Sequence, residues 1–303
     1  MIQKAIFQLD KADMEVMHIG PDQLPYVCIY EPMEHRVDGT ILWHWHPFFE
    51  IAYVAEGEIE CHSPDQMLHL KKGDAVFINS GVLHMYRKSR DTRCIIYAHI
   101  FDSTFLTGTL SSGMYQKYIY PIIQNPHIQL QLISPDNHHQ RLMLGCIENM
   151  IELARKEPFG YEFSLQAELS RFWCRLLTMT ADQQTAEPVE SGNDIQRIKV
   201  MLQYIHENYA RRITLKDIAD SASISERECS RCFQRCFRAS AIQYLNEHRL
   251  RTAARMLLES RQSVSQISES CGFGTASYFG KQFHEAMGCT PLEYRRKASG
   301  TEK

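Results

Sequence analysis

The sequence lacks a long hydrophobic run. Within its 303 residues, no stretch approaches the roughly 18 consecutive apolar residues that a membrane-spanning helix needs. The first residues, MIQKAIFQLDKAD, also carry charges where a secretory signal peptide has an unbroken apolar segment. We therefore expect a protein that neither spans a membrane nor is exported, and that resides in the cytoplasm.

The sequence also lacks the compact cysteine framework of small secreted proteins. Its ten cysteines are scattered over the chain, which predicts reduced thiols. Cys229, Cys232 and Cys236 lie along one side of a predicted helix. Such thiols can bind a metal or sense oxidants, but cysteine also packs as a small apolar residue, and the inner face of the helix is the favoured interpretation.

Positive charge is scarce in the N-terminal part of the chain. Residues 1–193 hold 15 Lys and Arg against 24 Asp and Glu, whereas residues 194–303 hold 18 against 12, so the two parts carry about −9 and +6. A basic domain joined to an acidic one is typical of a nucleic-acid-binding protein with a companion domain that does not bind nucleic acid. The chain length likewise predicts two domains.

The periodicity of apolar residues divides the chain further. Residues 1–135 contain short apolar strands separated by turns, which predicts a small β-barrel. Residues 136–180 have the helical period and predict two amphipathic helices, residues 181–193 are polar and aperiodic and predict a linker, and residues 194–297 are helical. The expected fold class is α+β. The clearest strand candidates are Phe48–Val54, Met67–Leu70, Ala75–Ile78 and Arg93–Phe101.

The two amphipathic helices have wide apolar stripes that must be buried. These stripes can cover the outside of the barrel or pair with the same helices of a second subunit, and both alternatives remain open. The stripes comprise Met143, Ile147, Met150, Ile151 and Ala154 in the first helix, and Leu165, Leu169, Phe172, Trp173, Leu176 and Leu177 in the second.

An internal repeat at an offset of about 50 residues occupies the C-terminal hundred residues. Each copy has a short helix, a tight turn and a second helix, over about 215–237 and 264–286, which is the spacing of a helix-turn-helix motif. The second helix of such a motif lies in the major groove of DNA. Phe233, Ser240, Ile242 and Tyr244 recur as Phe283, Thr290, Leu292 and Tyr294.

Each recognition helix needs an apolar inner face and a polar outer face that reaches DNA. Arg231 and Lys281 occupy equivalent positions in the two copies; either can reach phosphate, and Arg can also pair with guanine. The alternative for each residue is an ordinary solvated side chain. The predicted inward residues are Cys229, Cys232 and Phe233 in the first copy, and either Tyr278 or Phe279 together with Phe283 in the second. The predicted DNA-facing residues are Arg227, Ser230, Arg231, Thr275, Ser277 and Lys281.

These motifs resemble a known family. The stretch VSQISESCGFGTASYFGKQFHEAMGCTPLEYR resembles the signature of the AraC/XylS transcriptional regulators, and ITLKDIADSASISERECSRCF resembles their first helix-turn-helix. The resemblance covers residues 195–296. It implies a seven-helix domain in which a long helix, here about Glu247–Leu258, holds the two recognition helices in successive major grooves, and it favours a homodimer contact through the helical pair.

This chain departs from the family pattern after the first recognition helix. Arg238 stands where the family usually has the glycine that Gly288 supplies in the second copy, and Ala241 replaces the proline that Pro291 supplies. The geometry after the first recognition helix is therefore less firmly predicted than the geometry after the second.

Three histidines and a carboxylate lie in the predicted barrel. On one regular strand His44, His46 and Glu50 share a face, and a partner strand can bring His84 to them. Such a set suits zinc, manganese, iron or nickel. Trp43 or Trp45, whichever faces inward, suits a sugar face or an aromatic effector. The predicted effector pocket is Trp43, His44, His46, Glu50 and His84.

The two stretches around these residues, GTILWHWHPFFE and GDAVFINSGVLH, resemble the paired motifs of the cupin superfamily, whose metal ligands match His44, His46, Glu50 and His84. Asn79 replaces the usual proline of the second motif. Sensor domains of the AraC/XylS regulators often keep the histidines while enclosing an organic effector. A pocket with no required cofactor and a metal-containing site both remain open.

Two functions are compatible with this organisation. The first is a transcription regulator, expected to act as an activator, in which a sugar or other metabolite in the barrel changes the affinity for double-stranded DNA. The second is a cupin metalloenzyme, an isomerase or dioxygenase, with an appended helical domain. The basic repeat favours the regulator, which is no enzyme. The resemblance to the AraC/XylS regulators implies RNA polymerase and a second copy of the chain as partners.

Overall fold

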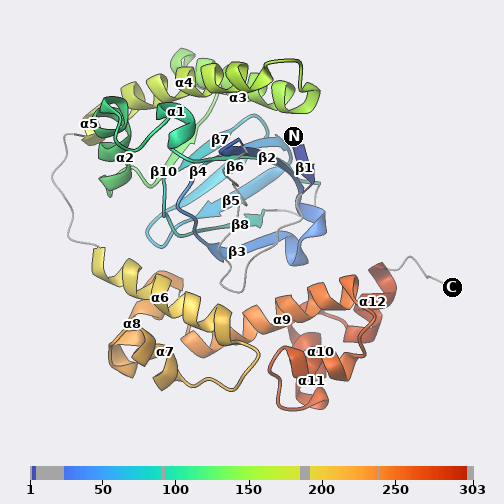
Figure 1. Cartoon of the computed structure of the whole chain (residues 1–303). Helices are drawn as coiled ribbons and strands as arrows, with labels where there is room; N and C mark the ends of the chain where they lie inside the picture. The colour runs from blue at the N-terminus through green and yellow to red at the C-terminus, as the bar shows by residue number, and fades with distance from the viewer. Residues whose placement is uncertain (1, 5–23, 90–92, 185–191, 238, 299–303) are drawn as a thin grey trace. The chain divides into compact units, whose positions relative to one another are not determined.

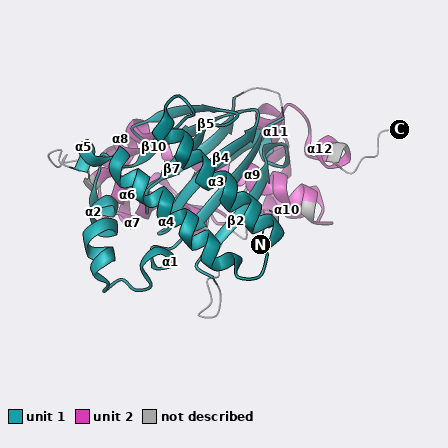
Figure 2. Cartoon of the chain, turned by 90° about the horizontal axis from the view of Figure 1, so that it is seen from above, with its two compact units in different colours: residues 1–10, 14–191 teal, residues 11–13, 192–303 magenta. Residues whose placement is uncertain are grey.

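A computed structural model describes residues 2–4, 24–89, 93–184, 192–237 and 239–298 of the chain. The chain forms two compact units: unit 1 comprises residues 1–10 and 14–191, and unit 2 comprises residues 11–13 and 192–303 (Figure 2). Unit 1 combines strands and helices, whereas the described part of unit 2 is helical. The predicted α+β class is confirmed. Within the described ranges, no helix is long and apolar enough to cross a membrane.

Unit 1 contains two facing sheets (Figure 1). The larger sheet has the strand order β1-β2-β9-β4-β7-β10 and the smaller has the order β3-β8-β5-β6. β1 is parallel to β2, and β2 is antiparallel to β9. The strands are β1 (Ile2–Lys4), β2 (Tyr26–Pro32), β3 (Thr40–His44), β4 (Phe49–Glu56), β5 (Glu58–His62), β6 (Met67–Lys71), β7 (Ala75–Ile78), β8 (His84–Lys88), β9 (Ile95–Phe101) and β10 (Leu130–Ile133).

The larger sheet is buried on both faces. All four residues of β7 are buried, and because side chains alternate along a strand, they supply two different cores. Val76 and Ile78 pack with Ile59 and Tyr86 of the smaller sheet, in the core between the sheets. Phe77 belongs to the second core, beneath the helices. This alternation also directs Glu50 of β4 into the space between the sheets.

Two long helices, α3 (His138–Lys156) and α4 (Tyr161–Met179), cover the outer face of the larger sheet (Figure 1). The Trp173 ring centroid lies 4.9 Å from that of Phe49 and 5.9 Å from that of Phe77. The predicted stripes are thus buried within unit 1. Any dimer contact through α3 and α4 has to use their outer faces.

Short helices interrupt unit 1 where the sequence predicts only barrel. α1 (Thr104–Thr107), a π-helical turn (Tyr115–Ile119) and α2 (Tyr120–Gln124) precede β10. Short 3-10 turns also occur at Met33–His35 and Val37–Gly39. Segments this short carry too few apolar repeats to show a helical period in the sequence.

The predicted linker, 181–193, is partly helical. α5 (Ala181–Gln184) continues the chain after α4, because the backbone N–H of Gln184 donates to the carbonyl of Thr180. α6 already begins at Gly192. The intervening residues 185–191 lie outside the described residues.

Unit 2 has seven helices in its described part, in agreement with the resemblance to the AraC/XylS regulators. The helix-turn-helix pairs are α7–α8 and α10–α11, close to the predicted ranges. The helices are α6 (Gly192–Asn208), α7 (Leu215–Ser221), α8 (Glu226–Phe237), α9 (Ala241–Glu259), α10 (Val264–Ser270), α11 (Ala276–Met287) and α12 (Pro291–Ala298).

Capping explains where the helices of unit 2 begin. The Ser225 hydroxyl accepts from the Glu228 N–H, as predicted for the start of α8. The long helix α9 begins at Ala241 and not near residue 247, because Ser240 and Gln243 form a capping box. Ala241 therefore occupies the first helical position, as Pro291 does in the second copy. Arg238, the other departure from the family pattern, lies outside the described residues.

Candidate effector site and DNA-binding surface

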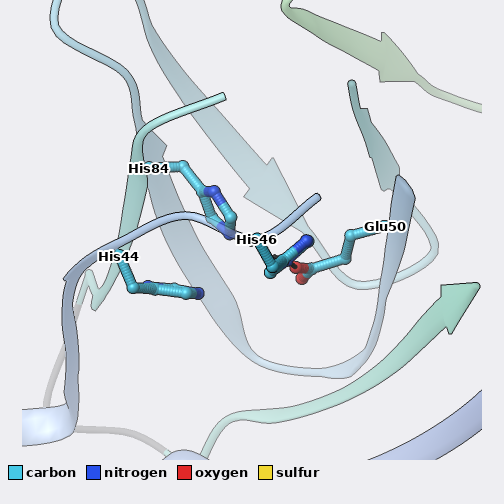
Figure 3. Close-up of side chains that lie close together, drawn as sticks. All are labelled: His44, His46, Glu50 and His84. Atoms are coloured by element: carbon cyan, nitrogen blue, oxygen red, sulfur yellow. Dashed lines mark hydrogen bonds and ion pairs between the residues drawn. The ribbon is translucent and has the colours of Figure 1, made fainter. Parts of the chain in front are cut away.

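His44, His46, Glu50 and His84 converge in unit 1, and we call them the His/Glu cluster (Figure 3). All four are buried, and one ligand atom from each lies within 4.8 Å of the others. His44 pairs with His84 across β3 and β8. The prediction of a single regular strand is wrong: β3 and β4 belong to different sheets, and the chain crosses between them at Pro47, which has no N–H for a strand ladder.

Backbone carbonyls orient all three imidazole rings. A carbonyl only accepts hydrogen bonds, so each Nδ1 carries a proton and each Nε2 faces the cluster. This is the usual arrangement of metal-binding histidines. The Nδ1 contacts are His44 to Leu42 at 2.7 Å, His46 to Phe48 at 3.1 Å and His84 to Val82 at 2.9 Å.

Glu50 lies against two of these Nε2 atoms. Its Oε2 is 3.1 Å from Nε2 of His46 and 3.2 Å from Nε2 of His84, and its Oε1 accepts a 2.6 Å hydrogen bond from the Tyr86 hydroxyl. Burial would raise the pKa of Glu50, but the hydrogen bonds with His46 and His84 outweigh it and hold the pKa well below its usual value. Glu50 is therefore a carboxylate.

His44 completes the electrostatics of the cluster. Burial is the main cause and the nearby His84 the second cause that lower the pKa of His44 well below its usual value. His44 is therefore a neutral imidazole. A buried carboxylate beside imidazole lone pairs requires either further protons on the rings or a cation among them. The donor set fits a divalent first-row metal ion.

The structure also places the two candidate tryptophans and Asn79, which departs from the cupin motif. Trp43 is half-buried in the irregular part of β3 between Ile41 and His44, and Trp45 is also half-buried. The place of Trp43 in the effector pocket stays a prediction. Asn79 is buried, and its amide donates to the carbonyls of Ile122 and Ile128 at 2.7 and 2.8 Å. Asn79 therefore positions both α2 and the segment that follows it.

The inner face of the first recognition helix, α8, is as predicted. Cys229, Cys232 and Phe233 are fully buried, and Cys236 is nearly so. Burial raises the pKa of Cys229 to about 11, which disfavours a reactive thiolate. These cysteines act as small apolar residues that pack α8 onto its unit.

In the second recognition helix, α11, Phe279 and Phe283 are buried, whereas Tyr278 is 48% exposed. Phe279 is thus the inward residue of the two alternatives. Ser277 and Lys281 are exposed, as predicted. Thr275 is also exposed, but it caps the helix: its hydroxyl accepts from the backbone N–H of Tyr278.

The outer side of α8 carries the predicted Arg227, Ser230 and Arg231, all exposed, and two exposed residues that the prediction omits, Gln234 and Arg235. Gln234 is exposed on the same face, seven positions after Arg227. Its equivalent in α11 at the offset of 50 is the exposed His284. The spacing of i, i+3 and i+7 from Arg227 is the signal that identifies Gln234.

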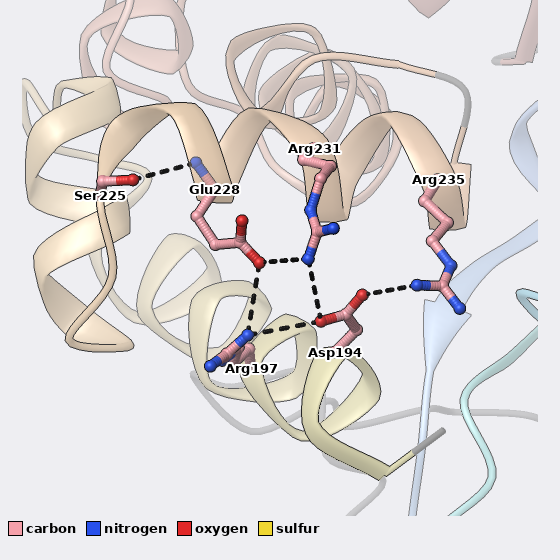
Figure 4. A network of polar contacts seen from close by, with 6 residues as sticks. All are labelled: Asp194, Arg197, Ser225, Glu228, Arg231 and Arg235. Atoms are coloured by element: carbon pink, nitrogen blue, oxygen red, sulfur yellow. Dashed lines mark hydrogen bonds and ion pairs between the residues drawn. The ribbon is translucent and has the colours of Figure 1, made fainter. Parts of the chain in front are cut away.

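Arg231 is part of an ion-pair network between α6 and α8 (Figure 4). Its guanidinium lies 2.6 Å from Glu228 and 3.9 Å from Asp194, and Arg235 lies 2.8 Å from Asp194. Arg197 contacts both carboxylates, at 3.3 and 3.4 Å. The hydrogen bond to Glu228 raises the pKa of Arg231 above its usual value. Lys281 has a much looser contact, 3.9 Å from Glu285.

Two family models match the chain. Residues 26–166 match the AraC-like ligand binding domain, which contains the His/Glu cluster. Residues 218–297 match a helix-turn-helix domain, which contains both recognition helices.

Three relatives extend these matches to most of the chain. The HTH-type transcriptional regulator YisR of Bacillus subtilis is 31% identical over 83% of this chain and 86% of its own length. A second Bacillus subtilis regulator, YdeC, is 25% identical over 97% of this chain and 99% of its own length. The transcriptional activator RhaS of Pectobacterium carotovorum is 25% identical over 86% of this chain and 89% of its own length.

Proposed function

Because this chain belongs to the AraC family of transcriptional regulators, we propose that a small metabolite bound at the His/Glu cluster controls how α8 and α11 engage DNA. The observation that carries the proposal is the buried, charged cluster inside a ligand-binding domain. Buried polar groups of this kind bind ligands with matching polar groups. Unit 2 supplies the DNA contact through exposed polar residues on two recognition helices.

A binding series tests this proposal. Thermal unfolding of the full chain is followed with candidate sugars and other small metabolites, and a compound that raises the midpoint is then tested on promoter DNA from the gene's own neighbourhood. A ligand that binds the native state must raise the midpoint as its concentration rises. We expect Glu50→Gln to abolish this rise while leaving ligand-free DNA binding unchanged. A compound that stabilises both chains equally would place the effector elsewhere.

We further propose that the His/Glu cluster holds a divalent ion such as zinc, manganese, iron or nickel. Support comes from the three Nδ1–carbonyl contacts, which leave the Nε2 atoms facing the cluster, and from the approach of Nε2 of His46 and His84 to Glu50. A bound ion would supply a positive centre that attracts an oxygen-bearing effector. This role requires no catalysis, and we propose none, because the relatives are transcriptional regulators.

Elemental analysis of protein purified without chelator tests the metal directly. We expect near-stoichiometric metal in the wild type, and a rise in the thermal midpoint when Mn, Fe, Ni or Zn is added to the stripped protein. Glu50→Gln replaces the one charged ligand by a neutral side chain of the same shape. The rise in the thermal midpoint on adding metal should therefore be smaller in this variant. Absence of metal together with an unchanged midpoint would contradict the proposal.

The remaining proposals concern partners. We propose a homodimer that pairs two copies of unit 2 on repeated half-sites, since simultaneous engagement raises avidity. We also propose activation through RNA polymerase in the cytoplasm, which the name of the relative RhaS as an activator supports. Light scattering of the full chain tests the dimer, and transcription with purified polymerase tests activation. A monomer at all concentrations, or repression alone, would contradict them.

A further inference from the structure

The two recognition helices differ in how their equivalent cations are held. In α8, Arg231 contacts Glu228 and Asp194, and Arg235 contacts Asp194 at 2.8 Å (Figure 4). These carboxylates are less exposed than the arginines: Asp194 is 15% exposed, whereas Arg235 is 58% exposed. In α11, the described contacts of Lys281 include only the 3.9 Å approach to Glu285. Among the described contacts, only the recognition helix of the first copy has its cations paired with a carboxylate of a neighbouring helix, Asp194 of α6.

We propose that Asp194 and Glu228 are positioning residues that hold Arg235 and Arg231 away from DNA phosphates and thereby weaken the binding of α8 to DNA, and that a movement of Asp194 releases Arg235. The two arginines have the charge and exposure to contact phosphates. Each carboxylate accepts the hydrogen bonds that the guanidinium would otherwise donate to a DNA phosphate. The carboxylates also repel the phosphates themselves.

The strength of these contacts suits a reversible restraint. Exposed ion pairs contribute little to stability, so each contact holds its arginine back by at most roughly five-fold in DNA affinity. A contact of this strength opens readily when a competing phosphate or a small helix movement is present. It therefore changes the affinity of α8 by degrees and does not block it.

Asp194 is also placed where a movement can reach it. It is the third residue of α6, which begins at Gly192, directly after the segment that joins unit 2 to unit 1. Arg235 lies 41 residues further along the chain, so its contact with Asp194 ties the recognition helix to the first turn of α6. This regulatory step rests on the proposed function, in which a metabolite bound in unit 1 controls how α8 engages DNA. The contacts themselves do not depend on it.

The test measures how salt weakens binding of the full chain to a random-sequence duplex of about 30 base pairs, three helical turns. The variant is Asp194→Asn, and the matched control is Glu207→Gln. Glu207 lies near the other end of α6 and contacts Gln203 of the same helix, so the control makes the same charge change away from α8. Circular dichroism confirms that each variant is folded.

We expect Asp194→Asn to free mainly Arg235, because Arg231 keeps its 2.6 Å contact with Glu228. Binding should tighten up to roughly five-fold relative to the control, and the slope of log affinity against log salt should steepen by about 0.9 for the one additional phosphate contact. Glu228→Gln should free Arg231 and steepen the slope by a similar amount. In an Arg235→Gln chain, Asp194→Asn should have no more effect than the control.

Two results would overturn the proposal. If both carboxylate variants behave like Glu207→Gln, the contacts do not restrain the arginines. If Asp194→Asn weakens binding, the carboxylate orients arginines in the DNA complex and does not restrain them. If Asp194→Asn fails to fold, Glu228→Gln decides alone. A wild-type chain whose binding shows no salt dependence would instead refute DNA binding by unit 2, which separates that failure from failure of the restraint.

Discussion

Replacing Gly272 by alanine tests how the second helix-turn-helix is packed. Gly272 lies in the turn between α10 and α11 with a φ of +74°, and a Cβ there would lie 2.4 Å from the carbonyl oxygen of Tyr209 and 2.9 Å from that of Ala210. The left-handed conformation costs an alanine about 1–2 kcal/mol, and the contact with two backbone atoms adds about 1–3 kcal/mol. We expect Gly272→Ala to destabilise unit 2 by roughly 2–5 kcal/mol.

Gly288→Ala is the matched control. Gly288 also has a left-handed φ of +67°, but a Cβ there meets nothing within 4 Å, so only the conformational cost of about 1–2 kcal/mol applies. The difference between the two variants isolates the close approach to the end of α6. The first copy offers a complementary comparison, because Ser223 occupies the equivalent position with a φ of 55°, and Ser223→Gly should be neutral or stabilise by up to about 1 kcal/mol.

Urea unfolding with two probes is the assay. The three tryptophans, at positions 43, 45 and 173, all belong to unit 1, so their fluorescence follows that unit, whereas circular dichroism also follows the helices of unit 2. Gly272→Ala should shift the helical transition and leave the tryptophan transition in place. A loss no larger than that of Gly288→Ala would refute the proposed packing of the turn against Tyr209.

Three further predictions follow from single residues. Burial lowers the pKa of His99 from 6.5 to about 3, so the unfolded chain takes up the proton first as the pH falls. The free energy of unfolding of unit 1 should therefore fall by about 1.4 kcal/mol per pH unit between pH 6.5 and 3. His99→Gln should reduce this slope in urea titrations followed by tryptophan fluorescence. Lys281→Ala should weaken binding uniformly across DNA sequences and lower the salt slope by about 0.9, because an exposed, loosely paired ammonium suits phosphate; a loss confined to one base position in competition binding would contradict this. Arg227→Ala should instead relax the preference at one base position by about 1–3 kcal/mol, and an unchanged preference would count against base contact.

The helical part of the fold could be predicted because its signals are local. The repeat, the apolar spacing and the capping residue Ser225 all lie within a few residues of the helices that they define. The start of α9 could also have been predicted from Ser240 and Gln243, whose capping box is visible in the sequence. The exact inward aromatic, Phe279 and not Tyr278, required the structure, because adjacent residues differ by only 100° around a helix.

The sites depended more on contacts that are distant in the sequence. The sequence identifies the four residues of the His/Glu cluster but not the route of the chain between them. Pro47 marks a place where a strand can end, but tertiary packing decides that the chain then joins the other sheet. The contact that restrains Arg235 is also not visible in the sequence, because its partner Asp194 lies 41 positions earlier and in another helix. Periodicity assigns a residue to a helix face but does not specify which neighbouring helix occupies that face.

Selection of bound sequences from a random duplex library tests the central claim, that this chain reads DNA through both α8 and α11. The full chain should enrich two sequence blocks about one helical turn, 10–10.5 base pairs, apart. Arg227→Ala should lose preference in one block and keep the other. Enrichment of no sequence, or of a single block that Arg227→Ala leaves intact, would contradict the claim.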